Sequence, residues 1–300
     1  MRSWFEGFQA RQFTLDGIEI FARHGGRAGA PPLLLLHGFP QTSAIWQRVA
    51  QQLGERFYLV MPDLRGYGRS ALPPGEPDHA NYSKRAMAAD MAALMTALGF
   101  ARFGLAGHDR GGRVAHRLAL DHPGRVSRLA LLDIAPTLDM YERTDMAFAR
   151  AYYHWFHLIQ PAPLPETMIG GDPLMYLRWK LGGWGSAGTG YIEPEALREY
   201  EQSFCRPAAI HAACEDYRAS AGIDLAHDRA SRAAGQRIGC DLLLLWGEHG
   251  VVQRLFDPLA LWQAQCAGRV EGRAVPAGHF IPEELPEQTA EALAAFMALA

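Results

Sequence analysis

A carboxylate set between glycines is the strongest chemical signal in the sequence: Gly107-His108-Asp109-Arg110-Gly111-Gly112. The apolar segment 103–106 precedes it, and a segment with helical spacing, 112–120, follows it. Glycines around one residue permit a sharp strand-to-helix turn that presents the central side chain in a cleft. A carboxylate placed there can displace a leaving group from an sp³ carbon and form an ester. We therefore predict that Asp109 is a nucleophile; the alternative is that it only caps the following helix.

The general base that such a nucleophile needs is expected near the end of the chain. The chain order nucleophile, acid, histidine places the base in the loop before the last helix. Among the twelve histidines of the sequence, His279 in Ala277-Gly278-His279-Phe280 has that position. We predict that His279 activates water; the alternative is an ordinary surface histidine.

The acid that orients this histidine is not in its usual place. After the apolar segment 242–246 the chain reads Gly247-Glu248-His249-Gly250, with a glycine where an aspartate would be expected. Asp133 directly follows the preceding apolar segment, and the carboxyl ends of parallel strands meet at one edge of a sheet. We therefore assign Asp133 as the acid. Glu248 and Asp257 remain alternatives, and helix capping is the other role open to Asp133.

A turn near the N-terminus could supply backbone donors to the same site. His37-Gly38-Phe39-Pro40 follows the apolar segment 33–36, and a sharp turn there can direct the N–H of Phe39 toward the nucleophile. Together with the N–H of Arg110 it would form an oxyanion hole. The alternative is a plain turn.

Two arginines, Arg110 and Arg113, lie beside the nucleophile, one helical turn apart. A guanidinium makes paired hydrogen bonds of fixed geometry to a carboxylate. We predict that both arginines bind the carboxylate of an anionic substrate. The alternative is that they pair with Asp109 or face solvent.

An aromatic stretch, Tyr152-Tyr153-His154-Trp155-Phe156-His157, contains several N–H and O–H donors. The leaving group that a carboxylate displaces from an sp³ carbon can be a halide. A departing halide is a small anion that an imidazole, an indole and a phenol can stabilise together. His154, Trp155 and a tyrosine further along the chain could supply these donors. The alternative is an aromatic packing face on a helix.

The elements that must position these residues alternate between two kinds. Short apolar segments, typical of strands buried on both faces, are separated by segments with helical spacing. The expected strands are 33–36, 57–61, 103–106, 129–132 and 242–246, and the expected helices are 45–53, 86–98, 112–120, 255–266 and 287–299. Residues 11–22 alternate apolar and polar and predict an edge hairpin. The pattern favours an α/β fold with a doubly wound, mostly parallel sheet.

The alternation breaks between 137 and 225, where aromatic residues recur at helical spacing. We predict a helical cap domain over 137–225, inserted into a core domain made of 1–136 and 226–300. The glycine-rich stretch 182–188 within it is expected to be a mobile loop, which argues against substrate contact by Trp184.

Composition excludes several classes of protein. The chain of 300 residues is 49% hydrophobic and 20% charged, and its formal net charge of -3 favours neither nucleic acid nor an acidic membrane surface. No apolar run is long enough to span a bilayer, and the N-terminus does not resemble a signal peptide. The four cysteines show no Cys-x-x-Cys spacing. We expect a cytoplasmic protein with no metal and no cofactor.

Taken together, these motifs resemble the haloacetate (fluoroacetate) dehalogenases of the α/β-hydrolase superfamily. The specific part is Asp109-Arg110-Gly111-Gly112-Arg113 with Asp133, His154-Trp155 and Glu215-Asp216-Tyr217-Arg218. The resemblance implies hydrolysis of a haloacetate to glycolate and halide through an ester on Asp109. It also implies that Tyr217 completes a halide pocket with His154 and Trp155, and that the protein is a homodimer.

Two other functions remain open at this point. An epoxide hydrolase would share the Asp nucleophile and the cap, but it typically carries Trp where this chain has Arg110, and an arginine pair suits an anionic substrate. A non-catalytic ligand receptor on the same fold would not need Asp109, Asp133 and His279 together.

Overall fold

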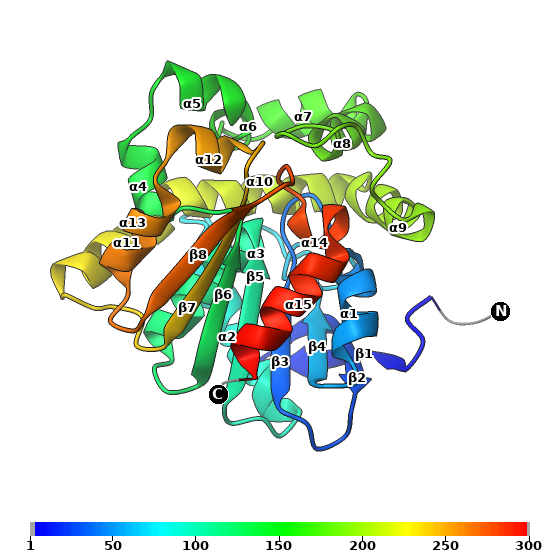
Figure 1. Cartoon of the computed structure of the whole chain (residues 1–300). Coiled ribbons are helices and arrows are strands. Elements are labelled where there is room, and N and C mark those ends of the chain that lie inside the picture. The colour runs from blue at the N-terminus through cyan, green and yellow to red at the C-terminus, as the bar shows by residue number, and fades with distance from the viewer. Residues whose placement is uncertain (1–3, 299–300) are drawn as a thin grey trace.

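The computed structural model describes residues 4–298, and in them eight strands form one sheet with the order β1-β2-β4-β3-β5-β6-β7-β8. The strands are β1 (Phe8–Leu15), β2 (Ile18–Gly26), β3 (Pro32–Leu36), β4 (Tyr58–Pro62), β5 (Phe103–His108), β6 (Val126–Leu132), β7 (Asp241–Gly247) and β8 (Val270–Val275). β2 is antiparallel to both β1 and β4, and all other neighbours are parallel. The predicted α/β fold with a mostly parallel sheet is confirmed (Figure 1).

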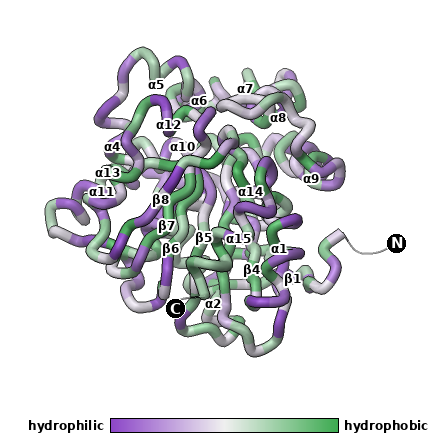
Figure 2. The backbone as a smooth tube through the Cα atoms, in the orientation of Figure 1, coloured by the Kyte–Doolittle hydropathy of each residue, from purple (hydrophilic) through white to green (hydrophobic). Residues whose placement is uncertain are grey.

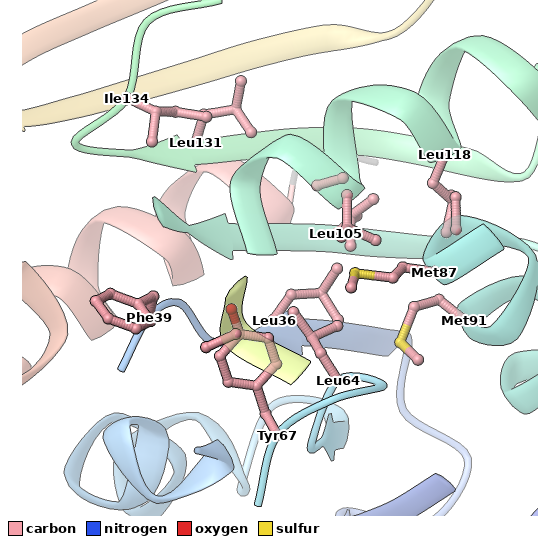
Figure 3. Close-up of a cluster of buried hydrophobic side chains, with 14 of the residues drawn as sticks. Leu36, Phe39, Leu64, Tyr67, Met87, Met91, Leu105, Leu118, Leu131 and Ile134 are labelled. Carbon is pink, nitrogen blue, oxygen red and sulfur yellow. The ribbon is translucent and has the colours of Figure 1, made fainter. Parts of the chain in front are cut away.

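The central strands are buried on both faces, as their continuous apolar sequences indicated. Leu33 and Leu35 of β3 belong to one hydrophobic cluster, whereas Leu34 and Leu36 belong to a second cluster on the other face. Figure 2 shows these strands as the apolar centre of the molecule, and Figure 3 shows the second cluster, where Leu36 lies among Leu105, Met87 and Met91.

Helices cover both faces of the sheet. α1 (Gln47–Leu53), preceded by the 3₁₀ helix η1 (Ser43–Trp46), packs with α15 (Pro286–Met297) against one face. α2 (Lys84–Ala97), which follows η2 (Ala80–Tyr82), packs with α3 (Asp109–Asp121) against the other. α14 (Ile281–Glu284) lies before α15. The predicted last helix extended to residue 299, which lies outside the described residues.

Two expectations about the C-terminal half were incomplete. The single helix expected over 255–266 is two helices, α12 (Val251–Leu255) and α13 (Pro258–Gln265), because Asp257 caps a new helix whose first residue is Pro258. β8 was not among the strands expected from the sequence. This strand lies at the edge of the sheet and is largely half-buried or exposed, so it lacks the apolar run that marks the inner strands.

Between β6 and β7 the chain forms helices and loops, with one isolated β-bridge from Ile238 to Cys266, and every residue of this segment is described. They are α4 (Thr137–Glu142), α5 (Met146–Ala151), α6 (Tyr153–His157), α7 (Leu164–Gly170), α8 (Pro173–Leu181), α9 (Pro194–Phe204), α10 (Pro207–Ala221) and α11 (Ile223–Ala233). We call α4–α10 the insertion; α5–α9 lie above one end of the sheet in Figure 1. The boundary expected at 225 falls inside α11, and the division into domains stays a prediction.

Residues 4–298 contain no helix that is both long and apolar enough to cross a membrane. The same residues contain no group of three or more His, Cys, Asp or Glu side chains arranged to hold a metal ion.

Candidate active site

The nucleophile motif forms the expected strand-to-helix turn. β5 ends at His108, α3 begins at Asp109, and Asp109 has a φ of 46°, a left-handed conformation that is uncommon outside glycine. The turn is crowded: a Cβ on Gly107 would lie 2.6 Å from the carbonyl oxygen of Gly111, and one on Gly38 would lie 2.4 Å from the Cβ of Asp109. Glycine is therefore required at both positions, and the strained turn directs the carboxylate out of the sheet.

The two oxygens of the buried Asp109 carboxylate have different surroundings. The N–H of Phe39 donates a hydrogen bond to Oδ1 over 2.9 Å. Oδ2 has no hydrogen bond within residues 4–298 and lies 3.8 Å from Nε2 of His279. Burial alone would raise the pKa of this carboxyl, but the positive potential of His279, His108 and the two nearby arginines outweighs it and lowers the pKa. The carboxylate is ionised, with one oxygen held and the other available.

Asp133 and His279 are brought together as the sequence analysis expected. Nδ1 of His279 lies 2.6 Å from Oδ2 of Asp133, and the N–H of Gly247 donates to the other oxygen over 3.0 Å. Burial lowers the pKa of His279, but the hydrogen bond and charge of Asp133 outweigh it, so the pKa is raised. The alternatives lie elsewhere: Glu248 contacts His249 at the surface, and Asp257 caps α13.

The second expected oxyanion donor, the N–H of Arg110, lies in the first turn of α3 and has no hydrogen-bond acceptor in the described part of the chain. The turn that carries the first donor is fixed by His37, whose Nε2 accepts the N–H of Leu64 over 2.9 Å. One N–H group is therefore in the turn after β3 and the other is in the first turn of the helix that Asp109 begins.

Arg110 is only partly available for a ligand, a point that the sequence analysis missed. Its Nε and Nη2 each donate to the carboxylate of Asp216 over 2.8 Å, and its guanidinium lies 4.2 Å from the ring centre of Tyr217. Nη1 has no partner among residues 4–298 although it is buried. Asp216 also accepts from Tyr67 and Lys84. Its position next to Tyr217 was noted from the sequence, but nothing there indicated which cation it would bind.

Arg113 is buried without a carboxylate partner in the described structure. Its Nη1 donates to Thr137 Oγ1 over 2.7 Å and to the carbonyl of Ala135 over 3.2 Å, while Nε has no partner there. Its guanidinium lies 4.6 Å from the ring centre of Trp155. Neither arginine pairs with Asp109 or faces solvent, which were the alternatives for this pair.

Two of the three expected halide donors, His154 and Tyr217, lie together on the insertion side. The ring of His154 stacks on Phe39 with centres 6.0 Å apart and lies 5.5 Å from the ring of Tyr217. Nδ1 of His154 and the hydroxyl of Tyr217 are buried, and neither has a hydrogen-bond partner within the described range. Trp155 is also buried and lies against Arg113, as described above.

Trp184 lies in the site, contrary to the expectation that its loop would keep it away from substrate. The centre of its ring system is 4.7 Å from that of His154 and 5.2 Å from that of His279. The glycines around it provided no signal for this contact, because a loop sequence does not specify which way its one aromatic residue will point.

Comparisons with known proteins identify the family of the chain. Residues 31–286 match the model of the alpha/beta hydrolase fold family. The chain is 46% identical to a fluoroacetate dehalogenase from Burkholderia sp, over 98% of this chain and 95% of that protein. It is 33% identical to a soluble epoxide hydrolase from Corynebacterium sp. (strain C12), over 90% of this chain and 91% of the relative.

A solved structure has the same fold as this chain. ALR0039 from Nostoc sp PCC 7120, provisionally described as an alpha/beta hydrolase, superposes with a TM-score of 0.94 at 50% identity, over 98% of this chain and 99% of the other. With the elbow at Asp109 and the family model covering most of the sequence, the chain belongs to the α/β-hydrolase family, and within it to the fluoroacetate dehalogenase group that its motifs resemble.

Proposed function

We propose that the protein hydrolyses the carbon–halogen bond of short 2-haloacids, converting a haloacetate and water to glycolate and halide. The observation that carries this proposal is the pair of buried arginines beside an ionised Asp109. Arg110 Nη1 and Arg113 Nε are buried N–H groups without partners in the described chain, and leaving such donors unpaired costs free energy. A substrate carboxylate would satisfy both and place its α-carbon near Asp109.

The first step is displacement at that carbon. Oδ2 of Asp109 attacks the α-carbon, the carbon–halogen bond breaks, and the halide leaves with the bonding electrons. Oδ1 stays on the N–H of Phe39 and becomes the carbonyl oxygen of the ester. Holding one oxygen leaves the other as the nucleophile.

The second step is hydrolysis of the ester. With its Nδ1–H donated to Asp133, His279 has an unprotonated Nε2 facing Asp109 and removes a proton from water as the water attacks Cγ of the ester. The negative charge that develops on Oδ1 is stabilised by the N–H of Phe39, together with that of Arg110. The bond between Cγ and Oδ2 then breaks, Oδ2 takes the proton from His279 and leaves as the hydroxyl of glycolate, and the Asp109 carboxylate, now carrying the oxygen of the water, is regenerated as it loses its proton.

The insertion would act as a cap domain that supplies the halide pocket. We propose that His154, Trp155 and Tyr217 donate hydrogen bonds to the departing halide in a site kept dry by their burial. The domain division at 136 and 225, the homodimeric state and the cytoplasmic location remain predictions from the sequence.

An epoxide hydrolase is the second candidate, favoured by the 33% identity to such an enzyme. A direct comparison separates the two: halide release from fluoro-, chloro- and bromoacetate, against diol formation from styrene oxide. We expect halide release and no diol. Diol formation without halide release would reject the proposal.

The covalent route has its own test. In a single turnover in ¹⁸O-labelled water, the label should enter the Asp109 carboxylate and not the first glycolate. Label in that first glycolate would show direct attack by water on the substrate.

A further inference from the structure

The loop that carries His279 is held by one side chain, that of Glu284. Oε2 of Glu284 accepts the N–H of Gly278 and Oε1 accepts the N–H of Phe280, each over 2.8 Å. These residues come immediately before and after His279, so one carboxylate binds the backbone on both sides of the candidate base. Because Asp133 binds Nδ1 of the imidazole, the backbone and the side chain of His279 are held by two different carboxylates.

Helix capping explains only part of this arrangement. α14 begins at Ile281, and a glutamate in the first turn of a helix can accept the N–H of the residue before the helix, here Phe280. Capping does not require the N–H of Gly278, which lies two residues further back. Glu284 has no ion pair within residues 4–298, so no cation in that part of the chain competes for its oxygens.

A third hydrogen bond to Glu284 comes from the insertion. Oγ of Ser186 donates to Oε1 of Glu284 over 2.7 Å. Ser186 lies in the glycine-rich stretch between α8 and α9, two residues after Trp184. The two loops are in close contact, since a Cβ on Gly278 would lie 2.4 Å from the backbone nitrogen of Ser186. The insertion is therefore linked to the loop of the base through one carboxylate.

The loop from the insertion also places Trp184. The centre of its ring system lies 4.7 Å from that of His154 and 5.2 Å from that of His279. Its φ of 58° is a left-handed conformation that persists in a non-glycine residue only where the surroundings fix it. The next residue, Gly185, is packed so closely that a Cβ there would lie 2.3 Å from the carbonyl oxygen of His249.

The position and the charge state of His279 both depend on this environment. Nε2 lies 3.8 Å from Oδ2 of Asp109, and a catalytic group displaced by about 1 Å can lose about 100-fold in rate. Burial lowers the pKa of His279, whereas Asp133, Asp109 and Glu284, in that order, raise it. Glu284 thus acts on the base through the backbone and through its charge.

We propose that Glu284 is a positioning residue that couples the base to the insertion: it fixes the backbone on both sides of His279 and, through Ser186, the loop that carries Trp184. The role in catalysis rests on the proposed function, in which His279 acts only in ester hydrolysis. Loss of Glu284 should therefore slow the second step and spare the first.

Glu284→Gln is the main test. The amide keeps the shape of the side chain but places an NH₂ donor opposite a backbone N–H and removes the charge. Rapid quench with chloroacetate should show a burst of halide at the wild-type rate, followed by turnover about 10- to 100-fold slower. The pH midpoint of the slow phase should move lower, because the pKa of His279 falls when a negative charge is removed.

Glu287→Gln is the matched control, because it removes the same charge from an exposed residue of α15. Neither phase should change in it. Equal slowing of both phases in Glu284→Gln would indicate general damage to the fold and would overturn the proposal. A slow phase as fast as that of the control would overturn it too, while leaving the proposed function intact.

Glu284→Asp separates position from charge. An aspartate keeps the negative charge but is too short to bind both N–H groups, so the slow phase should again be about 10-fold slower or more. Its pH midpoint should stay at the wild-type value. A slow phase at the wild-type rate in this variant would mean that charge alone matters, and the positioning role would be rejected.

The link to the insertion can be measured without substrate. Protein labelled with 5-fluorotryptophan has seven tryptophans, and the ¹⁹F NMR signal missing in Trp184→Phe belongs to Trp184. In Ser186→Ala this signal should shift or broaden, whereas that of Trp262, buried in α13, should not. An unmoved Trp184 signal would reject the link. If no haloacetate were hydrolysed, the proposed function would fail while this measurement still tested the link.

Discussion

The residues predicted to carry the chemistry, on the sheet side of the candidate active site, and the predicted halide donors, on the insertion side, differ in whether other protein groups already hold them. On the sheet side, Asp109 Oδ1 binds the N–H of Phe39, and His279 Nδ1 binds Asp133. On the insertion side, His154 Nδ1 and the Tyr217 hydroxyl are buried without a partner among residues 4–298. Groups that make and break covalent bonds are thus oriented by the protein, whereas groups that bind an anion are left for the ligand to complete.

The largest effect is expected on the sheet side, from Asp109→Asn. The amide is a poor nucleophile, so halide release from chloroacetate should fall by about 10⁴-fold or more. Rapid-quench measurement of a single turnover tests the first step directly. Retention of even a hundredth of the activity, with unchanged circular dichroism, would exclude Asp109 as the nucleophile.

His279→Gln should separate the two steps. One equivalent of halide should be released in a burst, after which turnover falls by about 10³- to 10⁴-fold, because only ester hydrolysis needs the base. Mass spectrometry should find the peptide containing Asp109 heavier by the carboxymethyl group. A variant that released no burst would show that His279 acts before the ester forms.

Arg113→Lys tests carboxylate binding by a residue of α3 that also contacts Trp155 of the insertion. A lysine keeps the charge but not the guanidinium geometry, so kcat/KM for chloroacetate should fall about 10- to 100-fold. Arg117→Lys is a matched control on the same helix, because Arg117 pairs with Asp121 and Asp228 away from the site. Equal, small effects in both variants would contradict carboxylate binding by Arg113.

On the insertion side, Tyr217→Phe should reduce activity without reducing stability. The hydroxyl lacks a partner within the described chain, so its removal should leave the thermal unfolding midpoint unchanged or slightly higher. Defluorination should fall about tenfold and dechlorination less, because fluoride needs the most help in leaving. Trp155→Phe on the same substrates extends the test. Equal and negligible losses on every substrate would mean that these residues only pack.

The smallest effect concerns pH and requires no substitution. His279 must be neutral to act as a base, and its pKa is raised, so ester hydrolysis should decline as the pH falls through a value above 6.5. The burst of halide should persist over that range, because the lowered pKa of Asp109 keeps the nucleophile ionised. Stopped-flow measurement of both phases between pH 5 and 8 would show whether they separate. If both phases declined in parallel as the pH fell, His279 would not be the base of the second step alone.

The sheet side could be predicted from the sequence because chain order and topology determine it. Asp109 and Asp133 each follow an apolar strand, and the carboxyl ends of parallel strands meet at one edge. The insertion side depends on packing between helices that are distant in sequence. Neither the hydrogen bond from Arg110 to Asp216 nor the contact of Trp184 with His279 has a local signal in the sequence. β8 was missed for a different reason, since an edge strand need not be apolar on both faces.

The glycine at position 250 bears on how such a site can evolve. A side chain there would begin 3.3 Å from Oδ1 of Asp133, and the backbone φ of -77° suits any residue. An acid serving His279 could thus stand at either of two positions, which follow the neighbouring strands β6 and β7 and lie close together in space. Two carboxylates so close would repel each other, so a lineage can relocate the acid only by vacating one position as it fills the other. We expect Gly250→Asp to be harmful alone and to recover part of the activity lost in Asp133→Gly, which would make the two positions historical alternatives for one function.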